Sequence, residues 1–220
     1  MKRNFVPGMP HHIIVRGNNR RRIFSYKRDM ERFVWDVGRA LLATRALLHA
    51  MTLMSNHVHL IVMAHELAQL SAFVKKFAQR YAQYRNRTRD ASGKLFEQRY
   101  FAEPIVSARQ LAITTAYVEL NAVRAGLVEH PLAYPWSTYA WHVDRPGESE
   151  IPSQLWTPTD WYQGLAGPPD VRAARYAAWV AECRARDVRP PRADEIAIIE
   201  ALSLGDYEHR IERPDGMRSL

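Results

Sequence analysis

The sequence predicts an α+β fold, a ferredoxin-like sandwich in which a mainly antiparallel β-sheet is covered by helices. Two observations favour this fold. Hydrophobic periodicity alternates in the order strand, helix, strand, strand, helix, strand, helix. In addition, two of the strand-like runs are separated only by Ser55 and Asn56, which predicts an antiparallel hairpin. A helical C-terminal extension is expected to follow these elements.

Each expected element has a strand-like or a helical hydrophobic pattern. In chain order they are a strand at residues 12–16, a helix at 27–44, hairpin strands at 47–54 and 57–63, a helix at 67–87, strand segments at 96–101 and 105–106, and a helix from 108 to 124 or 125. Pro104 interrupts the last strand signal, which suits an edge strand or a bend. Ser107 can cap the final helix, and Gly126 can occupy the left-handed position at its end.

The domain organisation follows from these patterns and from charge. We expect residues 1–145 to form the main domain, and residues 146–220 to form an acidic, partly helical C-terminal extension. This extension holds 13 acidic and nine basic residues. Helices are expected at residues 170–186 and 193–202, on either side of Arg189-Pro190-Pro191.

Composition excludes several classes of protein. Cys183 is the only cysteine, so the chain can form no internal disulfide and no cysteine-based zinc site. The first twelve residues lack a signal-peptide core, and no apolar run reaches the length of a membrane span. We therefore expect a cytoplasmic, nucleoid-associated location and no membrane partner.

Positive charge is concentrated in the first half of the chain. Residues 1–100 contain 19 Lys and Arg against six Asp and Glu, a net charge of +13, whereas the remainder has −5. Such a surface suits nucleic acid, although a solvated basic face without any partner would look the same. The candidate phosphate contacts are Arg20, Arg21, Arg22, Lys75, Lys76, Arg80, Arg85 and Arg87.

His57 and His59 flank Val58 in the second hairpin strand. Because side chains alternate along a strand, both imidazoles project to one face and can meet at one metal ion. The strand is apolar on both faces, which predicts a central position in the sheet. A His-x-His pair also arises by chance, so the spacing alone does not establish a metal site.

Tyr117 and Asn121 lie four residues apart in the helix that follows Ser107. Residues at this spacing share a helix face, so a phenol and an amide oxygen point the same way. Taken alone, the spacing favours an ordinary half-buried aromatic residue beside Ile113 and Leu120.

Five collinear segments resemble the REP-associated tyrosine transposases, which belong to the single-tyrosine HUH superfamily. They are PGMPHHIIVRGNNRRRIF from Pro7, MSNHVHLIV from Met54, LFEQRY from Leu95, YVELNAVRAGLV from Tyr117 and EHPLAYPWST from Glu129. The chain departs from the family pattern at Ser55 and Ala122, where the family has proline. Neither change removes a reacting group. The resemblance covers residues 5 to 142 and carries nothing over to the rest.

The resemblance implies an enzyme of DNA transposition that nicks single-stranded DNA and transfers the strand. It implies that Tyr117 attacks DNA to give a 5′-phosphotyrosine, with Mg²⁺ or Mn²⁺ held by His57, His59 and Asn121. The implied partner is a single-stranded DNA hairpin of REP type. The N-terminal candidates for base contacts are His11, His12, Arg16, Asn18 and Asn19.

Two alternatives remain open at this stage. A ferredoxin-like module could bind single-stranded nucleic acid without chemistry, and the basic first half supports this equally well. A metal-dependent hydrolase could use His57 and His59 to activate water. The sequence also leaves open a monomer or a homodimer.

Overall fold

The computed structural model describes residues 5–190, and its centre is a four-stranded antiparallel sheet. The strands are β1 (Pro10–Arg16), β2 (Leu47–Met54), β3 (His57–Met63) and β4 (Phe101–Pro104), and their order across the sheet is β2-β3-β1-β4. This order places β3 between β2 and β1, as its apolar faces predicted. The predicted α+β, ferredoxin-like fold is confirmed.

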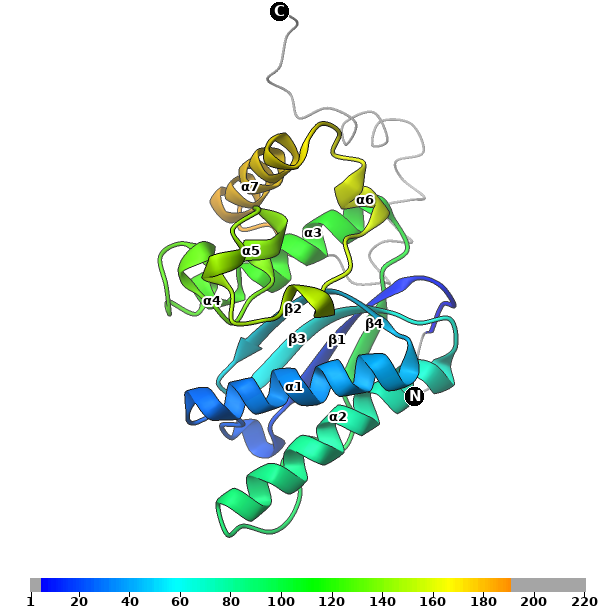
Figure 1. The fold of residues 1–220 in the computed structure, drawn as a ribbon, viewed down its shortest axis with the longest axis vertical. Coiled ribbons are helices and arrows are strands. Elements are labelled where there is room, and N and C mark those ends of the chain that lie inside the picture. Colours follow the sequence, from blue (N-terminus) through cyan, green and yellow to red (C-terminus); the bar gives the residue numbers. More distant parts are fainter. Residues whose placement is uncertain (1–4, 191–220) are drawn as a thin grey trace, which may run out of the picture.

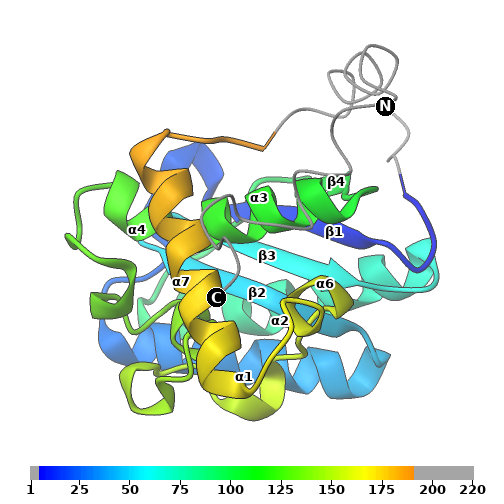
Figure 2. The same ribbon diagram turned by 90° about the horizontal axis from the view of Figure 1, so that it is seen from above.

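Helices cover both faces of the sheet (Figures 1 and 2). On one face lie α1 (Lys27–Thr44) and α2 (Leu67–Thr88), which pack against each other. The other face carries α3 (Ala108–Glu119), and helices that follow α3 in the chain lie around it. These are α4 (Asn121–Arg124), α5 (Tyr139–His142), α6 (Asp160–Gln163) and α7 (Pro169–Ala185). None of the described helices is long and apolar enough to cross a membrane.

The main hydrophobic core lies between the sheet and the helices α1 and α2. Alternate strand residues such as Ile13, Val58 and Leu60 face this core, and the aromatic rings of Phe33 and Phe77 fill it with centroids 5.3 Å apart. Burying such side chains contributes roughly 2 kcal/mol each, so this layer supplies much of the stability.

The outer edge of β2 is covered by the segment that follows α4. Met51 accepts a backbone hydrogen bond from Thr138 at 3.0 Å, and the Leu53 amide donates to the Trp136 carbonyl at 3.0 Å. Covering an edge in this way satisfies backbone groups that would otherwise remain open to another strand.

Two elements differ from the sequence-based expectation. The single helix expected from residue 108 is interrupted at Leu120, where ψ is −3°. Asn121 Nδ2 donates to the Tyr117 carbonyl at 2.8 Å, the carbonyl that a continuous helix would bond to the Asn121 amide. The strand expected at residues 96–101 is instead β4, at the edge of the sheet. Phe96 lies outside this strand, since it packs against the core and forms only an isolated bridge with Gly17. The helix expected at 193–202 lies outside the described residues.

Candidate active site

The sheet face toward α3 is polar at one end. His57 and His59 of β3 lie on this face, and the β1–β3 register places Arg16 beside His57 and Ile14 beside His59. Because alternate residues share a face, His12 of β1 lies on the same side as Arg16. Three imidazoles and one guanidinium are therefore gathered on one side of the two central strands.

Tyr117 of α3 lies against these histidines. Its ring centroid is 5.8 Å from that of His59 and 6.0 Å from that of His12, in edge-on arrangements. The helix is started by Ser107, whose hydroxyl accepts from the Gln110 amide at 3.2 Å. The structure thus brings together the tyrosine and the histidine pair, which are about 60 residues apart in the sequence.

Hydrogen bonds at the Nδ1 atoms orient both predicted ligand histidines. His57 Nδ1 lies 2.7 Å from Asn56 Oδ1, and His59 Nδ1 lies 2.9 Å from His12 Nε2. An amide oxygen can only accept, so His57 Nδ1 donates and Nε2 keeps its lone pair. When His59 Nδ1 donates to His12 Nε2, the Nε2 atom of His59 likewise keeps its lone pair for a metal ion.

The surroundings keep these imidazoles neutral. Burial lowers the pKa of His57, and the nearby Arg16 charge lowers it further. Burial also holds the pKa of His59 well below its ordinary value, with contributions from His12, His57 and Arg16. For His12, burial lowers the pKa to about 4. A neutral imidazole is the form that binds a metal ion.

Asn121 offers an oxygen rather than a nitrogen. Its Nδ2 donates to the carbonyls of Tyr117 and Val118 at 2.8 and 3.3 Å, so the amide oxygen is the atom left for a ligand. Within residues 5–190, no group of three His, Cys, Asp or Glu is arranged to hold a metal ion. Two imidazoles together with an amide oxygen would be a mixed donor set, of the kind that suits Mn²⁺ and tolerates Mg²⁺.

Arg124 is a site residue that the sequence reasoning missed. Its guanidinium carbon lies 4.9 Å from the ring centroid of Tyr117. One of its nitrogens donates to the Val188 carbonyl at 2.6 Å, and Nε lies 3.3 Å from Asp187. Both partners follow α7. The seven-residue spacing from Tyr117 is a two-turn helical repeat, and that signal could have suggested the contact.

Most of the predicted DNA-binding residues lie at the surface. Those with exposed or half-exposed side chains are Arg16, Asn18, Asn19, Arg20, Arg21, Arg22, Lys75, Lys76, Arg80 and Arg87. Asn19 and Arg20 have φ angles of 53° and 56°. Backbone in this left-handed region is costly for residues other than glycine and is found most often in turns and functional loops.

Three of the predicted DNA contacts are buried instead. The ring of His11 stacks on Phe5 with centroids 4.8 Å apart, and that of His12 is enclosed beside His59. Arg85 points inward, where Nε donates to the Ile23 carbonyl at 2.9 Å. None of these three side chains is presented to a base or a phosphate in this conformation, because each already has an internal partner.

Arginines also line an open hollow of about 210 Å³ beside the turn that follows β1. Arg21, Arg22, Arg85 and Arg89 contribute to its wall. Arg89 is held by Asp29 at 3.1 Å, which fixes its direction. Guanidinium groups fixed in this way favour phosphate oxygens.

The sequence of residues 5–121 matches the family model for IS200-like transposases, and this range includes His57, His59, Tyr117 and Asn121. The chain belongs to the IS200-like transposase family. The resemblance seen in the five sequence segments is thereby confirmed at the level of the family.

Two solved structures are similar to this chain. A structure of a REP-associated tyrosine transposase bound to a REP hairpin is similar in fold, with a TM-score of 0.52 and 17% identity over 72% of this chain and 91% of that one. A Deinococcus radiodurans protein described as a transposase has a TM-score of 0.39 and 19% identity, over 54% of this chain and 95% of its own. No curated protein matches the sequence.

Proposed function

We propose that this chain is a metal-dependent endonuclease and strand transferase that acts on single-stranded DNA with Tyr117 as the nucleophile. The observation that carries the proposal is the position of Tyr117 against His59 and His12, on the polar face of the sheet. Membership of the IS200-like family supports a role in DNA transposition. Residues 1–145 are the proposed catalytic domain.

The proposed reaction conserves the phosphodiester bond. The phenolic oxygen of Tyr117 loses its proton to solvent and attacks the scissile phosphorus, and the bond between that phosphorus and the 3′ oxygen breaks. The products are a 5′-phosphotyrosine and a 3′ hydroxyl, which takes up a proton. The 3′ hydroxyl can later attack the phosphotyrosine, so rejoining or transfer needs no ATP. The positive charge of Arg124 over the Tyr117 ring stabilises the negative charge that develops on the phenol.

His57, His59 and Asn121 would hold the divalent cation in this scheme. When bound, the cation supplies charge neutralisation at the scissile phosphate. The hydrogen bonds that the two imidazoles donate to Asn56 and His12 keep their ligating faces in place, and loss of such outer partners costs about 10- to 100-fold in metal affinity or activity.

The proposed substrate is a single-stranded DNA hairpin of REP type, because a REP-associated relative of the same fold is described as bound to such a hairpin. The proposed phosphate contacts are Arg20 at the end of η1 (Asn18–Arg20), Arg21 and Arg22 directly after it, and the exposed residues Lys75, Lys76, Arg80 and Arg87 of α2. Arg16, Asn18 and Asn19 remain the proposed base contacts.

The test is covalent capture. The protein is incubated with a labelled hairpin oligonucleotide and Mn²⁺, then separated on a denaturing gel. We expect a slow-migrating protein–DNA species that is lost in Tyr117→Phe and in the presence of EDTA, while hairpin binding by Tyr117→Phe persists. A matched variant, Tyr100→Phe, should still form the species.

Other outcomes would identify the alternatives. Cleavage that persists in Tyr117→Phe would show a hydrolase that activates water through the histidine pair. Tight binding of the hairpin by the wild-type protein, with neither cleavage nor a covalent species in Mg²⁺ or Mn²⁺, would show a non-catalytic binding module.

A further inference from the structure

Glu119 is the last residue of α3 and its side chain is fully buried. It follows Tyr117 by two residues, and successive helical residues are about 100° apart, so the two side chains lie on opposite flanks of the helix. Val118 between them packs against Ala50 and Ile61 of the sheet. Glu119 therefore points away from the histidines and toward the C-terminal helices.

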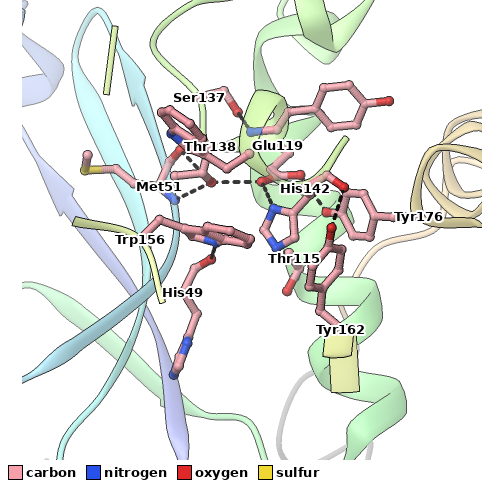
Figure 3. Close-up of polar contacts among 12 residues, drawn as sticks. His49, Met51, Thr115, Glu119, Ser137, Thr138, His142, Trp156, Tyr162 and Tyr176 are labelled. Carbon is pink, nitrogen blue, oxygen red and sulfur yellow. Dashed lines mark hydrogen bonds and ion pairs between the residues drawn. The ribbon is translucent and has the colours of Figure 1, made fainter. Parts of the chain in front are cut away.

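The carboxylate of Glu119 accepts hydrogen bonds from three separate segments (Figure 3). Its Oε1 accepts from Thr138 Oγ1 at 2.8 Å and from His142 Nδ1 at 2.9 Å. Its Oε2 accepts from the Tyr176 hydroxyl of α7 at 2.5 Å. All four side chains are at most 1% exposed. The C-terminal end of α3, the helix that carries Tyr117, is thus bonded to α5, to α7 and to the segment that covers β2.

The three donors are themselves held in place. Thr138 is fixed to β2, since its amide donates to the Met51 carbonyl and its hydroxyl accepts from the Met51 amide, both at 3.0 Å. The ring of His142 stacks on Tyr176 with centroids 4.5 Å apart, and Trp156 meets it edge-on at 4.9 Å. Glu119 is therefore attached to the sheet as well as to α7.

A buried carboxylate is a costly way to join helices. Taking it out of water costs several kcal/mol, and apolar residues of similar size would often pack as well. What the carboxylate adds is direction, because its hydrogen bonds fix the rotation of the helix about its own axis. This matters here because the helix is interrupted at Leu120, immediately after Glu119.

We propose that Glu119 is a positioning residue for Tyr117, and that Tyr176 of α7 takes part in this role. A rotation that lifted Tyr117 away from His59 would break the bonds of Glu119 to Thr138 and Tyr176 on the opposite flank. Helix α7 thereby contributes to the geometry of the proposed nucleophile. The role in catalysis rests on the proposed function of Tyr117.

The experiment compares Tyr176→Phe and Glu119→Gln with Tyr162→Phe. The control loses a buried hydroxyl from the same aromatic cluster, but that hydroxyl donates to the His142 carbonyl at 2.8 Å and not to Glu119. For each variant, hairpin affinity, the single-turnover rate of adduct formation at saturating protein, and hydrogen exchange over residues 111–124 are measured.

We expect both test variants to react about 10- to 100-fold more slowly, as misplaced reacting groups do. Their DNA affinity should stay within about twofold of the wild type, their exchange over residues 111–124 should rise, and Tyr162→Phe should match the wild type in rate and exchange. A folded Tyr176→Phe with wild-type rate and exchange would overturn the proposal, as would equal slowing by Tyr162→Phe. If the wild-type protein forms no adduct, the proposed function fails, and the exchange data alone decide whether Glu119 holds the end of α3.

Discussion

The two faces of the four-stranded sheet are built from alternate residues of the same strands, yet their chemistry differs. Toward α1 and α2, β3 presents Val58 and Leu60 to a closed apolar core. Toward α3, it presents His57 and His59 beside Tyr117. The two-residue period of a strand thus lets one segment carry stability on one side and proposed chemistry on the other. Substitutions on the two faces should have separable effects.

The largest expected effect is on stability, from the apolar face. Phe77 is fully buried between Phe33 and Phe73, with centroids 5.3 and 5.1 Å away. Phe77→Ala should lower the free energy of unfolding by about 3–5 kcal/mol through lost burial and a cavity. Urea denaturation measures this loss. Adduct formation per folded molecule should stay within about twofold of the wild type; a large fall in the folded protein would mean that the two faces are not separable.

A substitution of His59, on the polar face, should instead lower activity strongly and stability little. His59→Gln removes a proposed metal ligand, which should slow adduct formation by about 10³-fold, or about 4 kcal/mol in the barrier. Isothermal titration with Mn²⁺ should show weaker binding in the same variant. Its urea midpoint should remain closer to the wild type than that of Phe77→Ala. Wild-type Mn²⁺ affinity in a folded His59→Gln would remove this face from metal binding.

The sequence predicted much of this division and missed part of it. Period-two alternation placed His57 and His59 on one face of β3, and the helical spacing of Tyr117 and Asn121 was visible. The register between β1 and β3 was not visible in the sequence, because it depends on tertiary pairing. The placement of His12 against His59 therefore could not be predicted.

Arg85 shows a different limit of sequence reasoning. Its charge suggested a surface position, whereas burial of its stem and a bond to the Ile23 carbonyl hold it inside. The network around Glu119 was also not predicted, since its donors come from segments 19 to 57 residues further along the chain. Side-chain contacts over such distances leave no periodic signal.

A pH dependence should sharpen the comparison, because the polar face carries buried histidines. Burial lowers the pKa of His12 to about 4 in the folded protein, against about 6.5 when unfolded. Between these values the unfolded chain binds more protons, so this stability is fully present above pH 6.5 and is lost as pH falls toward 4. At pH 5.5 the loss from His12 is about 1.4 kcal/mol.

Denaturation in EDTA at pH 7.5, 6.5 and 5.5 measures this slope. His12→Gln should reduce it, whereas the exposed His65→Gln serves as the control. An unchanged slope in His12→Gln would show that the buried imidazole on this face contributes nothing to acid sensitivity.

The smallest expected effect is that of Lys76, on the exposed side of α2. Lys76 is exposed, whereas Arg85, nine residues later, is buried. Lys76→Gln should leave the urea midpoint unchanged and reduce the slope of log affinity against log salt by about one, because one phosphate contact is lost. Arg85→Gln should instead cost about 1–3 kcal/mol of stability, since it leaves the Ile23 carbonyl with one donor fewer. Equal salt slopes for Lys76→Gln and the wild type would place the DNA away from this part of α2, and the hollow lined by Arg21 and Arg22 would then be the next surface to probe.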